Sequence, residues 1–273
     1  MKTPRIAFVV VNFNNSPQTK TLCESLALQQ GRGTTFTLEC LVVDNSTDPE
    51  HREACAELGD AYSWLRYVRS DINLGYFGGV NRGLAERPQD EASFVVIGNN
   101  DLEFSPTFCQ GLMESTFDES VLAVCPDVVT LDGMHQNPHI ASPISWFRRL
   151  QFDVLFLNYY VARVGHPLRR LLSDARRPAR RSPAPRQAIH MGVGACYVLT
   201  PEFFSRFDRL NYPLFLYGEE AFLSAQIHSI GGKLIYEPSL HVTHSERAAT
   251  DTIERRAKYE LARQAYWSCR DLL

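Results

Sequence analysis

Short runs of apolar residues alternate with segments of helical periodicity over the first half of the chain. The runs have the length of buried strands and cover residues 6–11, 38–43, 65–68, 94–97 and 121–125. A polar residue followed by proline, which predicts a helix start, occurs at Ser16-Pro17, Asp48-Pro49, Ser105-Pro106 and Thr200-Pro201. This alternation predicts an α/β fold in which helices flank a mostly parallel sheet.

Polar residues follow the predicted strands at their carboxyl ends, where open parallel sheets bind ligands. Asn12 and Phe13 follow the first strand, Asp44 follows the second, and Asn99-Asn100-Asp101 follows the fourth. A glycine-rich segment, residues 73–83, follows the third strand and would let the backbone approach a ligand closely. Such residues also form ordinary turns and caps, but their convergence on one edge favours a binding site.

Two familiar phosphate-binding motifs are absent from the sequence. It contains neither the G-x-G-x-x-G dinucleotide fingerprint nor the G-x-x-x-x-G-K-[ST] loop. A nucleotide bound at this edge would therefore need another group to neutralise its phosphates. Asp101, beside two asparagines, is a candidate ligand for a hard divalent cation that bridges a diphosphate.

Two more polar clusters occur in the second half. Glu219-Glu220 opens a predicted helix that runs to Ile230 and ends at Gly231-Gly232. The helix dipole also favours acids in a first turn, so the pair has a structural as well as a catalytic interpretation. A strand over residues 233–237 then precedes a predicted loop with His241 and His244, which are either metal ligands or surface histidines.

The overall composition is that of an ordinary globular protein. The 273 residues are 44% hydrophobic and 22% charged. No run of about 18 apolar residues and no signal-peptide pattern is present, so we expect the protein inside the cell. Seven scattered cysteines without a C-x-x-C pair favour buried free thiols over a disulfide framework or zinc site.

The segment from Arg148 to Arg186 differs from the rest in charge. It contains ten arginines, no lysine and two aspartates, a net charge of +8 in a chain whose net charge is −3. A local anionic partner is therefore expected, rather than nucleic acid. Apolar residues at helical spacing over 146–172 predict a stripe that Gly165 and Pro167 break or kink, followed by a flexible basic linker over 175–186.

Three interpretations of this basic segment remain open. An amphipathic helix with arginines can lie on an anionic membrane surface, through residues 146–186. It can instead form a helical hairpin that packs on the sheet or at a dimer interface. The arginines can also hold the diphosphate of an acceptor.

Seven motifs, taken in order, resemble the inverting glycosyltransferases of family 2 and, within them, the bacterial rhamnosyltransferase-like subgroup. They span residues 5–131 and 189–246 and read VVVNFNN, LVVDNSTD, NLGYFGGVNRG, IGNND, GVGACYV, FLYGEE and GGKLIYEPSLHVTH. The resemblance implies one domain, residues 1–273, with the GT-A fold, a Rossmann-like nucleotide-diphospho-sugar transferase fold. Its parts are a nucleotide-sugar-binding half (1–134), a basic amphipathic insert (135–187), an acceptor and catalytic half (188–246) and a C-terminal helix (247–273).

The resemblance also assigns site residues. The donor-binding residues are Val11, Asn12, Phe13, Asp44, Asn73, Gly79, Asn81, Asn99 and Asn100, and the segment 78–81 is expected to form a turn near the diphosphate. Asp101, at the last position of the D-x-D-type signature, and the downstream His244 would bind Mg²⁺ or Mn²⁺. Glu220 matches the general base, with Glu219 as the alternative.

The function implied is transfer of rhamnose from dTDP-rhamnose, with inversion, to a hydroxyl of a saccharide or polyprenyl-diphosphate-linked saccharide in bacterial surface polysaccharide synthesis. A peripheral location on the cytoplasmic face of the inner membrane is expected, and a UDP-sugar is the alternative donor. Glu219-Glu220 in place of the usual Glu-Asp, and Phe222 in place of a second acid, also admit a catalytically degenerate scaffold that binds nucleotide sugar or membrane. A sugar nucleotidyltransferase is disfavoured because no Gly-rich loop followed by Arg and Lys opens the chain.

The aromatic residues of the C-terminal helix have two interpretations. Tyr259, Tyr266 and Trp267 either close the acceptor cleft or pack on the body of the protein, and packing is favoured.

Overall fold

The structure is a computed structural model that describes residues 3–29, 35–87, 94–163, 181–246 and 254–273. These residues form a nine-stranded sheet in the order β3-β2-β1-β4-β8-β6-β9-β5, with β7 paired to β9. The strands are β1 (Arg5–Asn12), β2 (Thr37–Asp44), β3 (Leu65–Arg69), β4 (Phe94–Asn99), β5 (Leu102–Phe104), β6 (Val121–Thr130), β7 (Gln187–Ile189), β8 (Cys196–Leu199) and β9 (Lys233–His244). The helices are α1 (Ser16–Ala27), α2 (Pro49–Ala61), α3 (Tyr76–Glu86), α4 (Phe108–Glu114), α5 (Trp146–Leu155), α7 (Pro201–Arg206), α8 (Glu219–His228), α9 (Arg255–Cys269) and the 3₁₀ helix η2 (Arg270–Leu272).

Parallel pairing is confirmed in the first half of the sheet. β1 lies between β2 and β4, β3 lies beyond β2, and all four strands are parallel. Asn12 is level with Asp44, and Val11 is level with Asn99, so these strands end at one edge. In the second half, β8 is antiparallel to β4 and β6, and β5 and β7 are antiparallel to β9. The sheet is therefore mixed, and its parallel half carries the polar strand ends.

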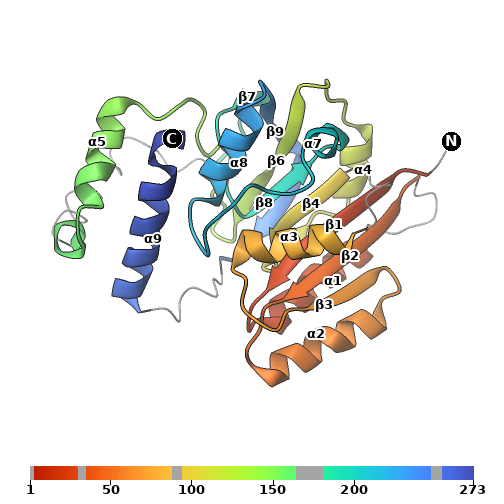
Figure 1. Cartoon of the computed structure of the whole chain (residues 1–273). Helices are drawn as coiled ribbons and strands as arrows, with labels where there is room; N and C mark the ends of the chain where they lie inside the picture. Colours follow the sequence, from red (N-terminus) through yellow and green to blue (C-terminus); the bar gives the residue numbers. More distant parts are fainter. Residues whose placement is uncertain (1–2, 30–34, 88–93, 164–180, 247–253) are drawn as a thin grey trace.

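Helices cover both faces of the sheet, as expected for an α/β fold (Figure 1). One apolar cluster includes Leu22 of α1 and extends to α4, and the other includes Phe77 of α3 and Leu223 of α8. Helix α3 lies close to β1 because Gly83 has no side chain: a Cβ there would lie 2.4 Å from a methyl carbon of Val9. This close packing fixes the start of α3 near the polar end of β1.

The predicted helix starts are confirmed in part. Asp48 and Thr200 cap α2 and α7, accepting hydrogen bonds from backbone N–H groups at 3.0 and 3.4 Å. Helix α1 has its N-cap one residue before the predicted Ser16. The start at Ser105-Pro106 is wrong: a turn in which Phe108 N–H donates to Ser105 O at 3.0 Å comes first, so α4 begins at Phe108.

The strand predicted over residues 233–237 is longer than expected. β9 continues to His244 and pairs in parallel with β6 on both sides of an irregularity at Pro126 and Asp127. His241 and His244 therefore lie on a strand, not on the predicted loop. An odd spacing on a strand turns side chains to opposite faces, so the two histidines have separate surroundings.

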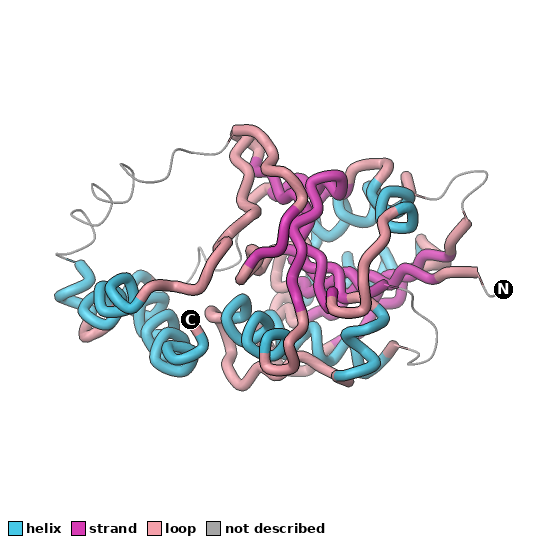
Figure 2. The backbone as a smooth tube through the Cα atoms, turned by 90° about the horizontal axis from the view of Figure 1, so that it is seen from above, coloured by secondary structure: helices cyan, strands magenta, loops and turns pink. Residues whose placement is uncertain are grey.

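The insert and the C-terminal helix form a pair away from the sheet (Figure 1 and Figure 2). No residue of α5 is buried, and α5 packs on α9 rather than on the sheet, which leaves the other interpretations of the insert as predictions. Within the predicted helical stripe over 146–172, the structure has a break that was not predicted. Helix α5 ends at Leu155, and Asn158 Oδ1 accepts from the N–H groups of Tyr160 and Val161, which caps a second helical segment over 159–163. The predicted break at Gly165 and Pro167, linker residues 175–180 and the predicted helix start at Thr250 lie outside the described residues.

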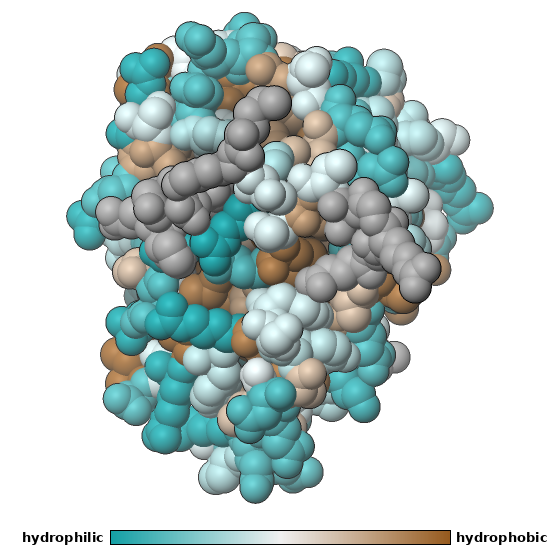
Figure 3. Space-filling view, turned by 90° about the vertical axis from the view of Figure 1, so that its right-hand side faces the viewer, coloured by the Kyte–Doolittle hydropathy of each residue, from teal (hydrophilic) through white to brown (hydrophobic). Residues whose placement is uncertain are grey.

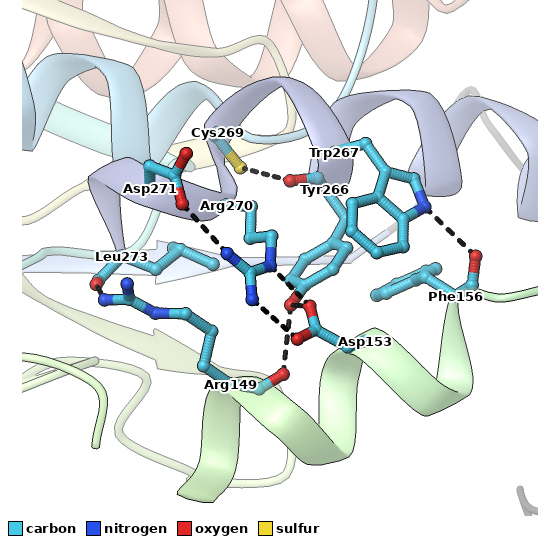
Figure 4. Close-up of polar contacts among 9 residues, drawn as sticks. All are labelled: Arg149, Asp153, Phe156, Tyr266, Trp267, Cys269, Arg270, Asp271 and Leu273. Carbon is cyan, nitrogen blue, oxygen red and sulfur yellow. Dashed lines mark hydrogen bonds and ion pairs between the residues drawn. The ribbon is translucent and has the colours of Figure 1, made fainter. Parts of the chain in front are cut away.

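An acid at the centre of the α5–α9 contact holds the two helices together (Figure 4). Asp153 forms two hydrogen bonds with the Arg270 guanidinium, at 2.6 and 2.7 Å, and accepts from the Tyr266 hydroxyl at 2.5 Å. These donors lower the pKa of Asp153 to about 2. The Tyr266 ring also stacks on Phe156 with 4.8 Å between centroids, and Trp267 Nε1 donates to Phe156 O at 3.1 Å. The aromatic residues of α9 thus pack on the insert.

The outer face of α5 is apolar. Trp146 is 76% exposed, Phe147 is 54% exposed, and Leu150 and Val154 are each 49% exposed. By contrast, hydrophilic residues cover much of the side that carries the N-terminus (Figure 3). A row of exposed apolar side chains marks an interaction surface. In the described part of the chain, no helix has the length and apolarity needed to cross a membrane.

All seven cysteines are free and buried, as predicted. Burial raises the pKa of each of the four thiols in the central strands and in α4, which are Cys40, Cys125, Cys196 and Cys109. They are therefore small core side chains that remain protonated at neutral pH.

Candidate active site

Side chains at the ends of the parallel strands bind one another. The Asn12 amide donates to Asp44 Oδ1 at 2.8 Å, and the Asn100 amide donates to Asn12 Oδ1 at 2.9 Å. Asp44 also accepts from the Tyr67 hydroxyl at 3.0 Å and from Ser46 N–H at 3.1 Å. Asn12 and Asp44 are fully buried. The expected convergence is thus confirmed, and this network makes the edge rigid, while donor binding by Asn12, Asp44 and Asn100 stays a prediction.

Other predicted donor-binding residues border this network with more exposure. Phe13, Asn73 and Asn99 are half-buried, whereas Val11 is 9% exposed. Asn99 N–H donates to Ala195 O at 3.0 Å, which leaves its side chain at the edge of the sheet. Phe13, Asn73 and Asn99 are therefore the members of the predicted set that a ligand reaches most easily.

The glycine-rich segment differs from the expected turn, because residues 78–81 lie within α3. Asn73 Oδ1 accepts from Gly75 N–H at 2.9 Å, and Gly75 has a φ of 71°, a conformation that favours glycine. A Cβ on Gly79 would lie 2.9 Å from methyl carbons of β1, so this glycine permits helix–strand contact. The Asn81 side chain donates to and accepts from the Leu210 backbone, both at 2.9 Å. Gly79 and Asn81 thus fix α3 and the loop before α8.

Asp101 and His244 lie together, as predicted for a metal site. His244 Nε2 is 3.3 Å from Asp101 Oδ1, and the residues are 9% and 6% exposed. Asp101 Oδ1 is buried and accepts no hydrogen bond. A buried carboxylate oxygen without a donor is unfavourable unless a cation binds it. The donor set, one carboxylate and one imidazole, therefore fits a divalent cation.

Only two protein ligands are found at this position. Among the described residues, no group of three or more His, Cys, Asp or Glu side chains is placed to hold a metal ion. Mg²⁺ commonly binds through one or two carboxylates and completes its shell with water and substrate phosphates. A cation at Asp101 and His244 would therefore depend on a phosphate-bearing ligand.

The far side of the His244 ring is also bonded. His244 Nδ1 is 2.9 Å from Gln136 Oε1, and the Gln136 amide donates to Glu246 Oε1 at 2.7 Å. Gln136 reaches the histidine because the chain turns back after β6, where Gln136 N–H donates to Val128 O at 2.8 Å. His241, by contrast, faces Asp127, 3.5 Å from its Oδ2, and does not join Asp101.

The two acids at the start of α8 have different surroundings. Glu219 is 8% exposed and accepts from Tyr217 N–H at 2.9 Å and from the Tyr212 hydroxyl at 3.3 Å. Burial and the charge of Glu220 raise the pKa of Glu219 to about 7. Glu220 is half-buried, and its Oε1 accepts from Gly194 N–H at 3.1 Å. Glu219 therefore holds its own loop, whereas Glu220 is the acid that a substrate can reach.

Tyr76 connects the acidic pair with the metal pair. Its hydroxyl donates to Gly194 O at 2.9 Å, and the N–H of the same glycine donates to Glu220 Oε1. Burial, then the nearby Cys196 and the charges of the acidic pair and Asp101, raise the pKa of Tyr76 well above its usual range. Gly194 therefore contacts both Tyr76 and Glu220, and its neighbour Ala195 accepts from Asn99 N–H, two residues before Asp101.

A cavity of about 190 Å³ opens beside Glu220. Helices α5 and α9 supply one wall, and α8 with the segment after β7 supplies the other. Apart from Glu220 and His139, its side chains are mostly apolar and include Ile140, Phe152, Phe156, Met191, Tyr266 and Leu273. Tyr266 thus both packs on α5 and lines the cavity, so the two interpretations of this residue are compatible.

Comparison with solved structures identifies the class of fold. GalNAc-T7 with UDP, GalNAc and Mn²⁺ matches with a TM-score of 0.62 and 14% identity, covering 91% of this chain and 45% of that chain. A mannosyltransferase from Pyrobaculum calidifontis with GDP-Man and Mn²⁺ has a TM-score of 0.58 and 16% identity, covering 100% and 69%. S. aureus TarS 1-349 with UDP-GlcNAc has a TM-score of 0.57 and 14% identity, covering 96% and 66%. These likenesses show the GT-A fold.

The family follows from the sequence. The model of glycosyl transferase family 2 matches residues 7–174, more than half of the chain, and the chain therefore belongs to this family. A search of curated proteins found no match. The chain spans less than half the length of GalNAc-T7 and about two thirds of TarS 1-349.

Sequence analysis missed three residues of the site. Tyr76 lies inside a motif that was noted for its glycines, and Gln136 and Glu246 lie outside the motifs. One signal was present for Gln136: Asp132-Gly133 is a typical turn dipeptide. A turn there folds the following residues back along β6 toward β9.

Proposed function

We propose that the chain is a metal-dependent inverting glycosyltransferase that moves a sugar from a nucleotide diphosphate to an acceptor hydroxyl. Rhamnose from dTDP-rhamnose is the proposed donor group, with a UDP-sugar as the alternative. Family membership supports the reaction class. Related folds crystallised with UDP, UDP-GlcNAc or GDP-Man, two of them with Mn²⁺, support a nucleotide-sugar donor and a divalent metal.

One observation carries this proposal: a reachable carboxylate and a cation-binding pair meet at the carboxyl edge of the sheet. Glu220 accepts from Gly194 N–H, and the adjacent Ala195 accepts from Asn99 N–H, two residues before Asp101. A transfer from a diphosphate needs a base for the incoming hydroxyl and positive charge for the departing phosphates. The site holds candidates for both.

Glu220 takes the role of general base. It accepts the proton of the acceptor hydroxyl as that oxygen attacks the anomeric carbon on the side opposite the diphosphate, which inverts the configuration. Such a base contributes about 10²–10⁴-fold to the rate. The bond from Gly194 N–H to Oε1 fixes the orientation of this carboxylate. Glu219 positions the loop through Tyr217 and does not contact the substrate.

The cation position belongs to Asp101 and His244. Mg²⁺ or Mn²⁺ bound there supplies positive charge to the diphosphate of the donor. The unpartnered Asp101 Oδ1 supports this assignment. Phe13, Asn73 and Asn99 are the half-buried edge residues proposed to contact the nucleotide.

The acceptor is proposed to enter the cavity beside Glu220, because a base must lie within hydrogen-bond reach of the hydroxyl. Its largely apolar wall suits the less polar face of a saccharide or the lipid side of a polyprenyl-diphosphate-linked saccharide. The exposed apolar row on α5 and the arginines of the insert support peripheral contact with the anionic cytoplasmic face of a bacterial inner membrane.

Thermal unfolding with dTDP-, UDP- and GDP-sugars, each with Mn²⁺ and with a chelator, tests the proposal. A ligand at about 100 times its dissociation constant adds ~2.7 kcal/mol, a rise of roughly 2–4 °C for a domain of this size. We expect one nucleotide class to stabilise the protein and the chelator to abolish the effect. If none of the nucleotide sugars stabilised the protein, the donor site would be contradicted. If a nucleotide sugar stabilised it but no acceptor received sugar, the catalytically degenerate scaffold would be favoured.

A further inference from the structure

His244 lies between two hydrogen-bond acceptors. Gln136 Oε1 is 2.9 Å from Nδ1, and Asp101 Oδ1 is 3.3 Å from Nε2. The orientation of the Gln136 amide follows from its other contact: Glu246 is a carboxylate, so the nitrogen of Gln136 must face it. The oxygen of Gln136 therefore faces the ring, and Nδ1 must carry the proton.

We propose that Gln136 and Glu246 are positioning residues that select the His244 tautomer with a bare Nε2, aimed at the cation position beside Asp101. This inference rests on the metal site of the proposed function. Metal-binding histidines generally donate their second ring N–H to a fixed acceptor, which orients the ring and raises its basicity. Here the acceptor is an amide that a second side chain holds in place.

The backbone around Glu246 supports a positioning role. Glu246 has a φ of 52°, in the left-handed region that is unfavourable for a residue with a side chain. The preceding residue, Ser245, donates its N–H to Asp101 O at 3.1 Å. The same short segment therefore ties Glu246 to the Asp101 backbone and to Gln136.

The chain contains a matched control for this contact. Gln110 donates to Glu114 Oε1 at 2.8 Å on the exposed surface of α4. The residue types are the same and the distance is similar, but this bond lies within one helix and, among the described residues, no hydrogen bond to a histidine is found at the other end of the amide. Gln110→Met removes a Gln–Glu bond without touching the site.

The tautomer is measured first, by ¹⁵N NMR of the metal-free protein at a pH where the ring is neutral. We expect the Nδ1–H form of His244 in the wild type and in Gln110→Met. Gln136→Met should shift the ring toward the Nε2–H form, which an unconstrained imidazole prefers. An Nε2–H form in the wild type, or no change in Gln136→Met, would overturn the inference.

Metal affinity is measured second, by titrating Mn²⁺ and following the free ion by EPR. Loss of such an outer contact typically weakens metal binding by about 10–100-fold, and we expect this for Gln136→Met but not for Gln110→Met. The double variant Gln136→Glu, Glu246→Gln exchanges the two side chains, so that a carboxylate accepts from His244 Nδ1 and an amide holds that carboxylate. It should restore the Mn²⁺ affinity to within about threefold of the wild type. Failure of this exchange to improve on Gln136→Met would contradict a positioning role.

A further variant separates this inference from the metal site itself. Asp101→Asn should lower Mn²⁺ affinity whether or not Gln136 and Glu246 position the His244 ring. Unchanged affinity in Asp101→Asn would contradict the metal site of the proposed function. Lowered affinity in Asp101→Asn together with unchanged affinity in Gln136→Met would contradict the positioning role of Gln136 and Glu246 and leave the metal site intact.

Discussion

Two buried aspartates at the same sheet edge have opposite surroundings. Asp44, at the end of β2, accepts hydrogen bonds from the Asn12 amide, Ser46 N–H and the Tyr67 hydroxyl. Asp101, after β4, has a buried oxygen without a donor and an imidazole 3.3 Å away. Asp44 therefore cross-links neighbouring parts of the fold, whereas the described part of the protein supplies no hydrogen-bond donor to Asp101 Oδ1.

The contrast extends to the strands that carry these residues. The parallel half of the sheet surrounds Asp44 with donors, so its charge is compensated within the protein. At the start of α8, burial and the charge of the neighbouring Glu220 raise the pKa of Glu219. Buried polar groups left uncompensated are unfavourable for stability and are typical of functional sites. The predictions below test this division, from the largest expected effect to the smallest.

Glu220→Gln should have the largest effect on activity. Loss of the base should lower kcat by about 10²–10⁴-fold, while the temperature shift caused by a bound nucleotide sugar stays unchanged. Transfer assays and thermal unfolding measure the two. Glu219→Gln is the matched control, because that side chain can still accept from Tyr217 N–H. A larger loss in Glu219→Gln than in Glu220→Gln would reverse the assignment.

Asp44→Ala and Asp101→Ala should differ in stability. Asp44→Ala leaves several buried donors unpaired and should lower the free energy of unfolding by about 3 kcal/mol. Asp101→Ala removes an oxygen that has no donor and should change stability by less than about 1 kcal/mol. Urea unfolding of the metal-free variants measures both. Equal losses would refute the division between a structural and a functional aspartate.

Glu219→Gln should change the pH dependence of stability. The pKa of Glu219 is raised to about 7 in the folded protein, so the folded state holds this proton more tightly than the unfolded state. The resulting stability is complete below the unfolded pKa, near pH 4.5, and is lost as the pH rises toward 7. Because Gln does not ionise, the free energy of unfolding of the variant should rise by roughly 1–2 kcal/mol relative to that of the wild type when the pH is raised from 5 to 8.

Urea unfolding of both proteins at pH 5 and at pH 8 measures this difference. Glu57→Gln, at an exposed position on α2, is the control and should show no gain. A gain of the same size in Glu57→Gln, or none in Glu219→Gln, would contradict a raised pKa for Glu219.

The smallest effect is expected on the outer face of α5. Phe147→Ser removes an aromatic side chain that is 54% exposed and should weaken binding to vesicles with anionic lipid by about two- to tenfold. Co-sedimentation with vesicles measures the binding, and Leu28→Ser, at a 67% exposed position on the body, is the control. Equal binding by Phe147→Ser and the wild type would argue against membrane contact through this face.

Sequence reasoning succeeded where one rule of geometry applies. Asn12, Asp44 and Asn100 could be placed together because parallel strands end at one edge. The Asp101–His244 pair was predicted from a resemblance, and the structure brings the two side chains within 3.3 Å.

The rest depended on chain reversals and long-range contacts. Gln136 meets His244 only because a turn at Asp132-Gly133 folds the chain back along β6. Within the described part of the insert, the helix is interrupted where Asn158 caps a second helical segment, and no sequence pattern predicted this break. The cavity beside Glu220 forms only where α9 packs on α5, and the sequence pattern of neither helix predicts which element it packs against.

The pairing of α5 with α9 keeps one wall of the cavity beside Glu220 apart from the packing that holds the sheet. The cavity wall formed by Phe152, Phe156 and Tyr266 lies outside the two large apolar clusters of the sheet. Exchange of these helices between relatives should therefore alter acceptor choice without disturbing the donor half. The salt bridge between Asp153 of α5 and Arg270, directly after α9, joins these two helices to each other, so the pair is held together by contacts of its own.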